Sequence, residues 1–433
     1  MTIRAKELLS CAAVMLACWT AAAQEPVVPA PRRDDTAGKP VPDARIDDAP
    51  GKAPKFWSVA LAETVMARWP DYNLAYHGSW TYVHGYTLCG FEMLYRATGD
   101  RRYFDFIKCY IDQHVDRHGN FRQVIDGRGR MRDTVFDLQD NMMPGNTLVM
   151  LYETTGDKHY KTAAATIRRA LDGYPRNRNG GLWHSRRLNG QWWIDGIFMS
   201  QMFLIRYAQS IGDAEYCFDE ATRQIIAYAQ TAERGDTGMM VHGTYEPGHG
   251  GPDCRWADPE TGLSPEVWSE GLGWYALVTV ETLGRLPADH ARRGEVEAIF
   301  RRVCAGLKHN QDTVTGGWFT VVDKPDAPGN WIDSSGTAMF VYTLQRGIEL
   351  GLLDGAVYGP VVAQGYRAMT GLMKVNAAGL VDVYSASDGL AVQASYEAYI
   401  NNPRRILNAK EAVAGLLWAT TLIERPELEK LRD

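Results

Sequence analysis

Two aspartates in glycine- and aromatic-rich segments are the residues best suited to chemistry. Asp140 lies in the stretch DLQDNMMPG, just before a helix predicted to start near Pro144. Asp195 lies in WWIDG, next to Trp193 and two residues before a second predicted helix. Either carboxylate could simply cap a helix. A carboxyl held against aromatic rings, however, loses hydration, and its pKa then rises toward the range of a general acid.

A third segment with chemical potential runs from MMVHGTYEPGHGG to WADPETGLSPEVW. We expect His242, Trp268 and Glu270 to lie in one long loop ahead of a helix near Trp274. Loops of this length without structure of their own are usually functional. The spacing of His242 and His249 matches no established metal site, so we expect hydrogen bonding to a substrate and no metal.

Aromatic residues gather near these segments. The chain has 13 Trp and 21 Tyr, and those placed between predicted helices include Trp80, Tyr82, Trp183, Trp192, Trp193, Trp256 and Trp268. Any one of them could be core, but indole and phenol rings also stack on sugar faces. Their clustering with His, Asp and Gly favours a carbohydrate cleft. Two carboxylates on different hairpins are what a glycosidase needs, although sequence leaves their separation, and hence retention or inversion, open.

A repeated phrase indicates the elements that must position these residues. An aromatic residue near a helix end, then Gly-Asp, then Tyr three residues later recurs in 93–103, 150–160 and 205–216. The Gly suits a helix C-cap and the Asp suits the next N-cap. Repeats of this length fit pairs of helices. Six helical hairpins fit the chain length, and we predict an all-α (α/α)6 barrel, with an open solenoid as the alternative.

Composition and the chain ends set the expected context. Residues 1–23 have a short positive region, an apolar run and small residues, which predicts a signal peptide. Residues 24–55 are rich in Pro and Asp and predict a disordered segment, and residues 56–433 predict a single domain. No later segment is apolar for long enough to span a membrane. We expect a periplasmic or secreted protein, with lipid anchoring through Cys18 as an alternative.

Several motifs together resemble glycoside hydrolase family 105, the unsaturated rhamnogalacturonyl hydrolases, and the related unsaturated glucuronyl hydrolases. They are WTYVHGYTLCGFEMLYRATGD, DLQDNMMPG, GGLWH, WWIDGIFMSQMF, WADPETGLSPEVW and SSGTAMFVYTLQRGIELG, and they run in order from Trp57 toward the C-terminus. The resemblance implies an (α/α)6 barrel without metal or organic cofactor. It also implies an acidic oligosaccharide substrate left by a polysaccharide lyase, with a C4=C5 double bond in its terminal uronic acid.

The same resemblance implies roles for individual residues. Asp195 would protonate C4 and activate water, and Asp140 would bind and orient the ring. The substrate-contacting positions it implies are His184, Trp193, His242, Trp268, Trp80 and Tyr82.

The chain departs from the family pattern after Trp268. Many members have a small residue and then Arg there, whereas Ser269 is followed by Glu270 in this chain. Arg would bind a uronate carboxylate, but Glu would repel it unless protonated or paired. We therefore expect rebuilt acid recognition, with Lys410 or Arg186 supplying the positive charge.

Two other functions compete with this interpretation. An exo-glycosidase acting on saturated uronides could use the same barrel and the same carboxylates. A non-catalytic glycan-binding protein would need the aromatic residues but not both Asp140 and Asp195. The net charge of −6 and the lack of a basic stripe argue against nucleic acid as a partner. A monomer and a homodimer are both compatible with the sequence.

Overall fold

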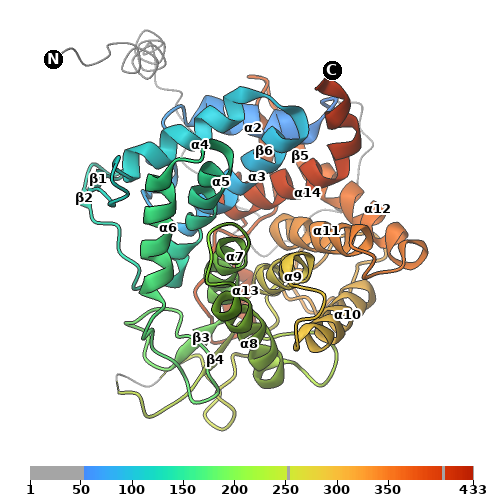
Figure 1. The fold of residues 1–433 in the computed structure, drawn as a ribbon. Coiled ribbons are helices and arrows are strands. Elements are labelled where there is room, and N and C mark those ends of the chain that lie inside the picture. Colours follow the sequence, from blue (N-terminus) through green and yellow to red (C-terminus); the bar gives the residue numbers. More distant parts are fainter. Residues whose placement is uncertain (1–52, 251–253, 402–404, 433) are drawn as a thin grey trace, which may run out of the picture.

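The computed structural model describes residues 53–250, 254–401 and 405–432. The predicted signal peptide, and residues 24–52 of the predicted disordered segment, lie outside these ranges. Within the described part, long helices alternate along the chain between an inner and an outer layer (Figure 1). None of these helices is both long enough and apolar enough to cross a bilayer.

Six helices of the described part form the inner layer, and each packs against the next. In chain order they are α3 (Tyr82–Thr98), α5 (Gly145–Thr155), α7 (Ile194–Ser210), α9 (Ser269–Arg285), α11 (Ser334–Glu349) and α14 (Lys410–Leu428). The ring closes because α14, near the end of the chain, packs along α3, near its beginning. The predicted (α/α)6 barrel is confirmed, and the open solenoid is wrong.

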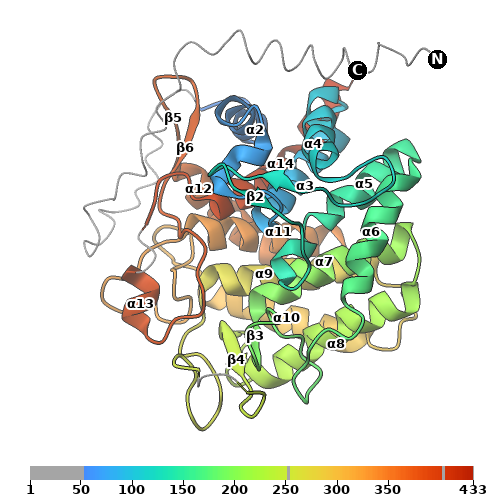
Figure 2. The ribbon, with the colours of Figure 1, turned by 90° about the vertical axis from the view of Figure 1, so that its left-hand side faces the viewer.

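The outer layer consists of helices that each pack on the inner ring. They are α2 (Trp57–Arg68), α4 (Arg101–His114), α6 (Lys158–Ala170), α8 (Ala214–Ala232), α10 (Arg293–His309) and α12 (Gly355–Gly371). A further short helix, α13 (Tyr396–Asn401), lies outside this alternation (Figure 2). The short 3-10 helices are η1 (Tyr72–His77), η2 (Gln139–Met142) and η3 (Glu429–Leu431).

The sequences of the helices explain their division into two layers. In α9 every residue from Ser269 to Leu283 is buried, because an inner helix meets protein on all sides. In α4, by contrast, the buried residues include Tyr103, Ile107 and Tyr110, which are spaced along one face. The other face of α4 carries charged side chains toward solvent.

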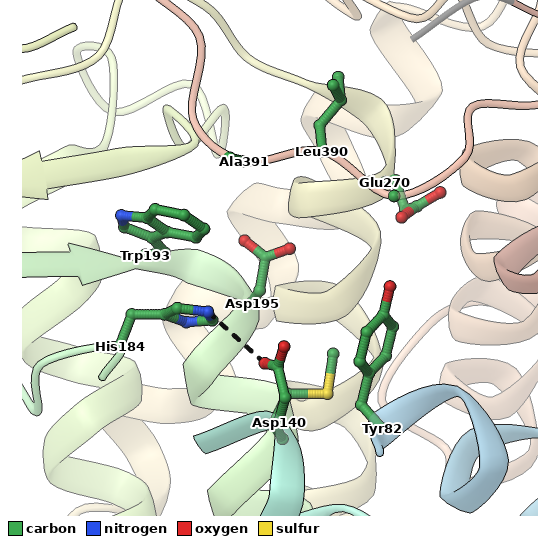
Figure 3. Close-up of a pocket in the computed structure, with 10 residues that line it drawn as sticks. Tyr82, Asp140, His184, Trp193, Asp195, Glu270, Leu390 and Ala391 are labelled. Atoms are coloured by element: carbon green, nitrogen blue, oxygen red, sulfur yellow. Dashed lines mark ion pairs between the residues drawn. The ribbon is translucent and has the colours of Figure 1, made fainter. Parts of the chain in front are cut away.

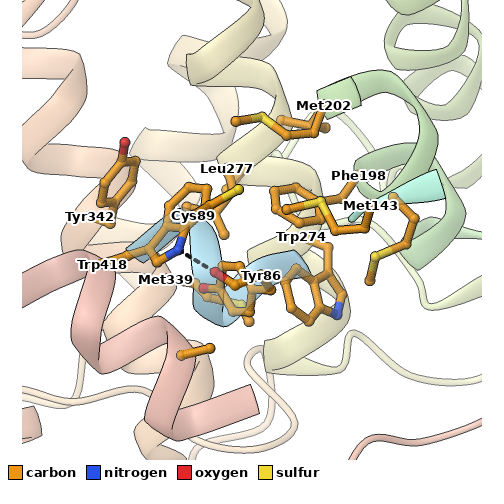
Figure 4. Packing of buried hydrophobic residues seen from close by; sticks show 14 of the residues in the cluster. Tyr86, Cys89, Met143, Phe198, Met202, Trp274, Leu277, Met339, Tyr342 and Trp418 are labelled. Atoms are coloured by element: carbon orange, nitrogen blue, oxygen red, sulfur yellow. Dashed lines mark hydrogen bonds between the residues drawn. The ribbon is translucent and has the colours of Figure 1, made fainter. Parts of the chain in front are cut away.

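Aromatic rings fill the middle of the barrel (Figure 4). Tyr86 of α3 lies between Trp418 of α14 and Trp274 of α9, with ring centroids 4.9 and 4.7 Å away. Phe198 of α7 packs on Trp274 at 4.8 Å. The Trp418 indole N–H donates to the backbone oxygen of Tyr86 at 2.8 Å. These four rings, which we call the aromatic plug, pack together in the interior of the barrel.

The repeated Gly-Asp phrase caps helices in two of its three copies. Gly99 and Gly156 are left-handed C-caps, with φ of 73° and 71°. Asp100 and Asp157 then accept hydrogen bonds from the backbone N–H groups two residues further on, at 3.0 and 3.4 Å. In the third copy the predicted cap is wrong. Asp213 is itself left-handed, and its carboxylate binds the Arg168 guanidinium at 2.8 Å instead of capping α8.

Short antiparallel strand pairs lie in the connections between helices. They are β1 (Val124–Ile125) with β2 (Met131–Arg132), β3 (Gln191–Trp193) with β4 (Gly243–Tyr245), and β5 (Met373–Val375) with β6 (Val381–Val383). The register of the second pair sets Trp193 opposite Gly243. The Ile194 N–H then donates to the His242 carbonyl at 3.0 Å. This pairing brings the start of α7 beside His242.

The contact between α3 and the backbone before α5 gives a stability prediction. A Cβ on Gly85 would lie 2.5 Å from the backbone nitrogen of Pro144. Gly85→Ala must therefore push the two segments apart, and we expect it to lower the free energy of unfolding by about 1–3 kcal/mol. Denaturant unfolding measures this change.

The matched control is Gly294→Ala in α10, where an added Cβ meets nothing within 4 Å. We expect this control to leave stability unchanged or to raise it by up to about 1 kcal/mol, because Ala favours helix over Gly. Equal effects of the two substitutions would contradict the close approach at Gly85.

Candidate active site

A pocket opens at the end of the barrel where several inner helices begin. Its volume is about 180 Å³, and its lining residues are Tyr82, Asp140, His184, Trp193, Asp195, Met199, Glu270, Gly389, Leu390 and Ala391 (Figure 3). Tyr82, Asp195 and Glu270 come from the first turns of α3, α7 and α9. The aromatic plug begins one turn further along the same helices, since the Tyr82 ring meets the Trp274 ring edge-on at 6.3 Å.

The helices at the pocket begin earlier than the sequence predicts. Helix α7 starts at Ile194, so Asp195 belongs to its first turn. Helix α9 starts at Ser269, so the prediction that Glu270 lies in a loop is wrong. Asp140 lies in η2, shortly before α5. First-turn positions hold side chains more firmly than a loop, because their backbone already belongs to a helix.

Asp195 is held by a chain of buried hydrogen bonds. Its Oδ2 lies 3.0 Å from Nε2 of His242, and His242 Nδ1 lies 2.9 Å from the Tyr399 hydroxyl. His242 has no exposed surface. A carboxyl oxygen without a proton only accepts hydrogen bonds, so Nε2 of His242 donates to Oδ2 of Asp195, and Nδ1 then accepts from the Tyr399 hydroxyl. This chain occupies Oδ2 and leaves Oδ1 of Asp195 for the pocket.

Asp140 faces the same pocket from the neighbouring segment (Figure 3). Its Oδ1 lies 3.6 Å from His184 Nε2, and the His184 ring stacks on Trp193 with centroids 4.3 Å apart. Burial raises the pKa of Asp140, the nearby His184 opposes this rise, and the charge of Asp195 adds to it. The charge of Asp195 therefore favours the protonated form of Asp140.

Gln139 fixes η2 against the start of α7. Its side-chain amide donates to the Trp183 carbonyl at 2.8 Å and accepts from the Ser200 hydroxyl at 2.5 Å. A Cβ on Gly196 would lie 2.7 Å from Nε2 of Gln139, so only a glycine leaves room there. This bridge keeps Asp140 and Asp195 in one arrangement.

A second group of acids lies beside the pocket, and Glu270 is the member of this group in the pocket lining. The Tyr82 hydroxyl donates to Glu411, which also binds the Lys410 ammonium at 2.9 Å. Lys410 is bound by Asp388 as well, at 2.8 Å. Glu270 is buried beside this group, and burial together with the charges of Glu411 and Asp333 raises its pKa well above the usual range.

Some predicted substrate contacts lie behind the pocket wall. Trp268 is fully buried and packs on the His242 ring at 4.6 Å. Trp80 is 5% exposed, and its indole N–H donates to the Asn141 backbone oxygen at 2.7 Å. Neither ring, nor His242, lines the pocket. The structure therefore places these residues where they support Asp195 and η2.

The predicted cation sources are also placed differently. Arg186 stacks on the Tyr174 ring and donates to a backbone oxygen of α6, so the prediction that it supplies charge to the site is wrong. Lys410 lies next to the pocket but is already engaged by two carboxylates. Among the described residues, no group of three or more His, Cys, Asp or Glu side chains is placed to hold a metal ion.

Sequence reasoning did not find Tyr399, Gln139, Glu411 or the segment 389–391. Gln139 lies inside the motif that carries Asp140, and Glu411 lies next to Lys410. Tyr399 is 157 residues from its partner His242, and only the folded chain reveals that contact.

A closed ring of helices with paired carboxyl groups in one pocket is an arrangement that suits a glycoside hydrolase of the helical-barrel class. The sequence profile of Glycosyl Hydrolase Family 88 matches residues 57–425, and the chain belongs to this family. The resemblance to family 105 is also confirmed. A solved family 105 glycoside hydrolase from C. acetobutylicum superposes with a TM-score of 0.76 and 26% identity, covering 86% of this chain and 99% of that one.

Curated relatives match over shorter stretches. Protein Atu3128 of Agrobacterium fabrum is 36% identical over 176 residues, which cover 41% of this chain and 72% of the relative. The unsaturated 3S-rhamnoglycuronyl hydrolase of Formosa agariphila is 24% identical over 185 residues, covering 41% of this chain and 46% of the relative. A solved unsaturated glucuronyl hydrolase specific for heparin shares the fold, with a TM-score of 0.54 and 14% identity over 81% of this chain and 88% of that one.

The buried chain behind Asp195 gives a kinetic prediction. Tyr399→Phe removes the hydroxyl at His242 Nδ1. Leaving a buried polar group unpaired costs about 1–3 kcal/mol. We expect a lower Tm and a lower kcat with little change in KM, measured on an acidic oligosaccharide that the wild type cleaves.

The matched control is Tyr275→Phe, because the Tyr275 hydroxyl is also buried and donates to the Ile225 carbonyl at 2.7 Å, away from the pocket. It is expected to lower Tm and to keep the wild-type kcat. If both variants keep the wild-type kcat, Tyr399 has a structural role alone.

Proposed function

We propose that the enzyme releases a terminal 4,5-unsaturated uronic acid from acidic oligosaccharides left by polysaccharide lyases. The observation that carries this proposal is the convergence of Asp140 and Asp195 in one small pocket beside the stacked rings of His184 and Trp193. A small pocket that lies next to the packed rings of the barrel interior favours the end sugar of a chain over an internal one. The flat Trp193 ring suits a flattened, unsaturated sugar.

The relatives support the same reaction class. The Formosa agariphila relative is named as an unsaturated 3S-rhamnoglycuronyl hydrolase, and one solved structure with this fold is an unsaturated glucuronyl hydrolase. Both names describe removal of an unsaturated uronyl group. We carry this reaction class, without the particular polymer, over to the present enzyme.

The proposed reaction begins with hydration of the double bond. In such a sugar the ring oxygen is attached to C5, so C4=C5 is a vinyl ether. Asp195, carrying a proton on Oδ1, donates it to C4, and the π electrons form the new C–H bond. The positive charge is then shared by C5 and the ring oxygen. A water molecule adds to C5 and returns a proton to Asp195, which restores the acid.

The product of hydration is a hemiketal, and it breaks down without further demands on the protein. The bond between C5 and the ring oxygen breaks, which leaves a ketone at C5 and a hemiacetal at C1. The hemiacetal collapses to an aldehyde and expels the rest of the oligosaccharide as an alcohol. One water molecule is consumed in total.

Asp140 is proposed to bind and orient the ring during these steps. Its raised pKa keeps a larger share of the carboxyl protonated, and the protonated form both donates and accepts hydrogen bonds. Its link to His184 aligns it with the Trp193 ring. Asp140 can thus hold ring hydroxyls while Asp195 reaches C4.

The test is the ultraviolet absorbance of the conjugated double bond, measured on a panel of lyase-generated disaccharides. We expect the wild type to remove this absorbance from at least one member. Asp195→Asn cannot supply the proton, so its rate should fall by at least about 100-fold. The control is Asp137→Asn, because the Asp137 carboxylate pairs with Arg187 outside the pocket lining, and it should keep the wild-type rate.

The competing function, cleavage of saturated uronides, gives a different result. It would leave the absorbance of every unsaturated disaccharide unchanged and would release sugar from saturated substrates. That outcome would overturn the proposal.

A further inference from the structure

One pocket-lining carboxyl group is left over by the proposed chemistry. Glu270 is 1% exposed, lines the pocket, and its Oε2 has no hydrogen-bond partner among the described residues. A buried oxygen of this kind is costly unless a ligand or a proton satisfies it. The unpaired Oε2 of Glu270 therefore indicates that this side chain interacts with a ligand bound in the pocket.

The surroundings of Glu270 are rich in acids and poor in cations. Glu411 is fully buried, and its Oε2 also lacks a partner in the described part of the chain. Asp333, at the start of α11, accepts from the Ser269 hydroxyl at 2.6 Å and from a backbone N–H at 3.1 Å. Lys410 is a cation whose charge acts on Glu270, and Glu411 and Asp388 already bind it.

An anionic sugar could not bind in this pocket if every acid in and beside it were ionised. Even with the catalytic proton on Asp195, ionised Glu270 and Glu411 would together outweigh the charge of Lys410, and Glu270 would repel a carboxylate directly because it lines the pocket. The proposed substrate carries a carboxylate next to its double bond. At least one of these carboxyl groups must therefore be neutral when the sugar binds.

We propose that Glu270 is a specificity-determining residue that meets the substrate carboxylate as a neutral carboxylic acid and donates a hydrogen bond to it. This inference rests on the proposed function, because it assumes an acidic end sugar. A hydrogen bond from a neutral acid to a carboxylate is charge-assisted and short. Glu270 would thus recognise an acid without a positively charged residue.

The groups that face Glu270 support the neutral form. Burial is the largest influence that raises its pKa, and the charges of Glu411 and Asp333 act in the same direction. Lys410 and the Ser335 hydroxyl oppose them. Tyr82 and Tyr86 face it from α3, and burial raises both phenol pKa values, so neither phenol is charged near neutral pH. The net effect keeps the pKa of Glu270 well above its usual range.

A dependence of substrate binding on pH follows. When Glu270 ionises at high pH, it loses its hydrogen and repels the substrate carboxylate. KM for an acidic substrate should then rise by up to about tenfold per pH unit. Glu270→Gln keeps a neutral donor and should show a KM that varies little with pH. Glu270→Ala has no donor and should show a raised KM at every pH.

The control is Glu153→Gln, because Glu153 lies near the C-terminal end of α5 and pairs with Arg96 outside the pocket. It should keep the pH profile of the wild type. The proposal is overturned if Glu270→Gln follows the wild-type rise in KM, or if Glu270→Ala binds the acidic substrate as well as the wild type at low pH.

A binding experiment separates this inference from the proposed function. Calorimetry with glucuronate as the probe reports on Glu270 whether or not any unsaturated disaccharide is cleaved. The background is Asp195→Asn, and affinity should fall as pH rises unless Glu270 is also replaced by Gln. If no disaccharide of the panel loses its absorbance, the proposed reaction is rejected but the role of Glu270 is not. If glucuronate binding does not depend on pH, the role of Glu270 is rejected.

Thermal unfolding gives a second readout independent of turnover. A carboxyl whose folded-state pKa is raised holds its proton more tightly in the folded protein, so stability falls as pH rises above the ordinary carboxyl range. Glu270→Gln removes this loss. Its Tm minus that of the wild type should grow between about pH 5 and about pH 8. A constant difference would contradict a neutral Glu270.

Discussion

The packing of α14 against α3 is the constraint on which the rest of the molecule depends. These helices come from the two ends of the described chain, and their contact turns a row of hairpins into a ring. Closure of the ring brings the first turns of the inner helices to the end of the barrel that carries the pocket. Asp195, Glu270 and Glu411 are far apart in the sequence but belong to those first turns, so the ring places all three at the same end of the barrel.

Local patterns were sufficient to predict the barrel and its key carboxyls. Gly-Asp caps set the hairpins at Asp100 and Asp157, and the motifs around Asp140 and Asp195 identified residues that do meet in one pocket. Each cap joins residues two positions apart, so the local sequence is enough to predict it. Asp213 differs because a distant Arg168 competes for its carboxylate, and no local pattern records that contact.

Long-range burial accounts for what sequence missed. Trp268 and His242 look like ligand-contacting residues in a glycine-rich stretch, yet packing places them beneath Asp195. The β3–β4 pairing and the hydrogen bond from Tyr399 hold His242 in this position, and both contacts join segments far apart in the chain. The charge state of the acids in and beside the pocket is likewise a property of the fold, since it depends on how many acids and cations are buried together.

The aromatic plug has a consequence for the order of events. Tyr86, Trp274, Phe198 and Trp418 pack together in the barrel interior, one turn or more beyond the residues that line the pocket. A sugar chain cannot pass along the barrel axis through these rings, so substrate enters and products leave at the pocket side of the barrel. The released oligosaccharide lies nearer the mouth of the pocket, so it leaves before the uronic acid. The uronic acid then competes with the next substrate molecule for the pocket.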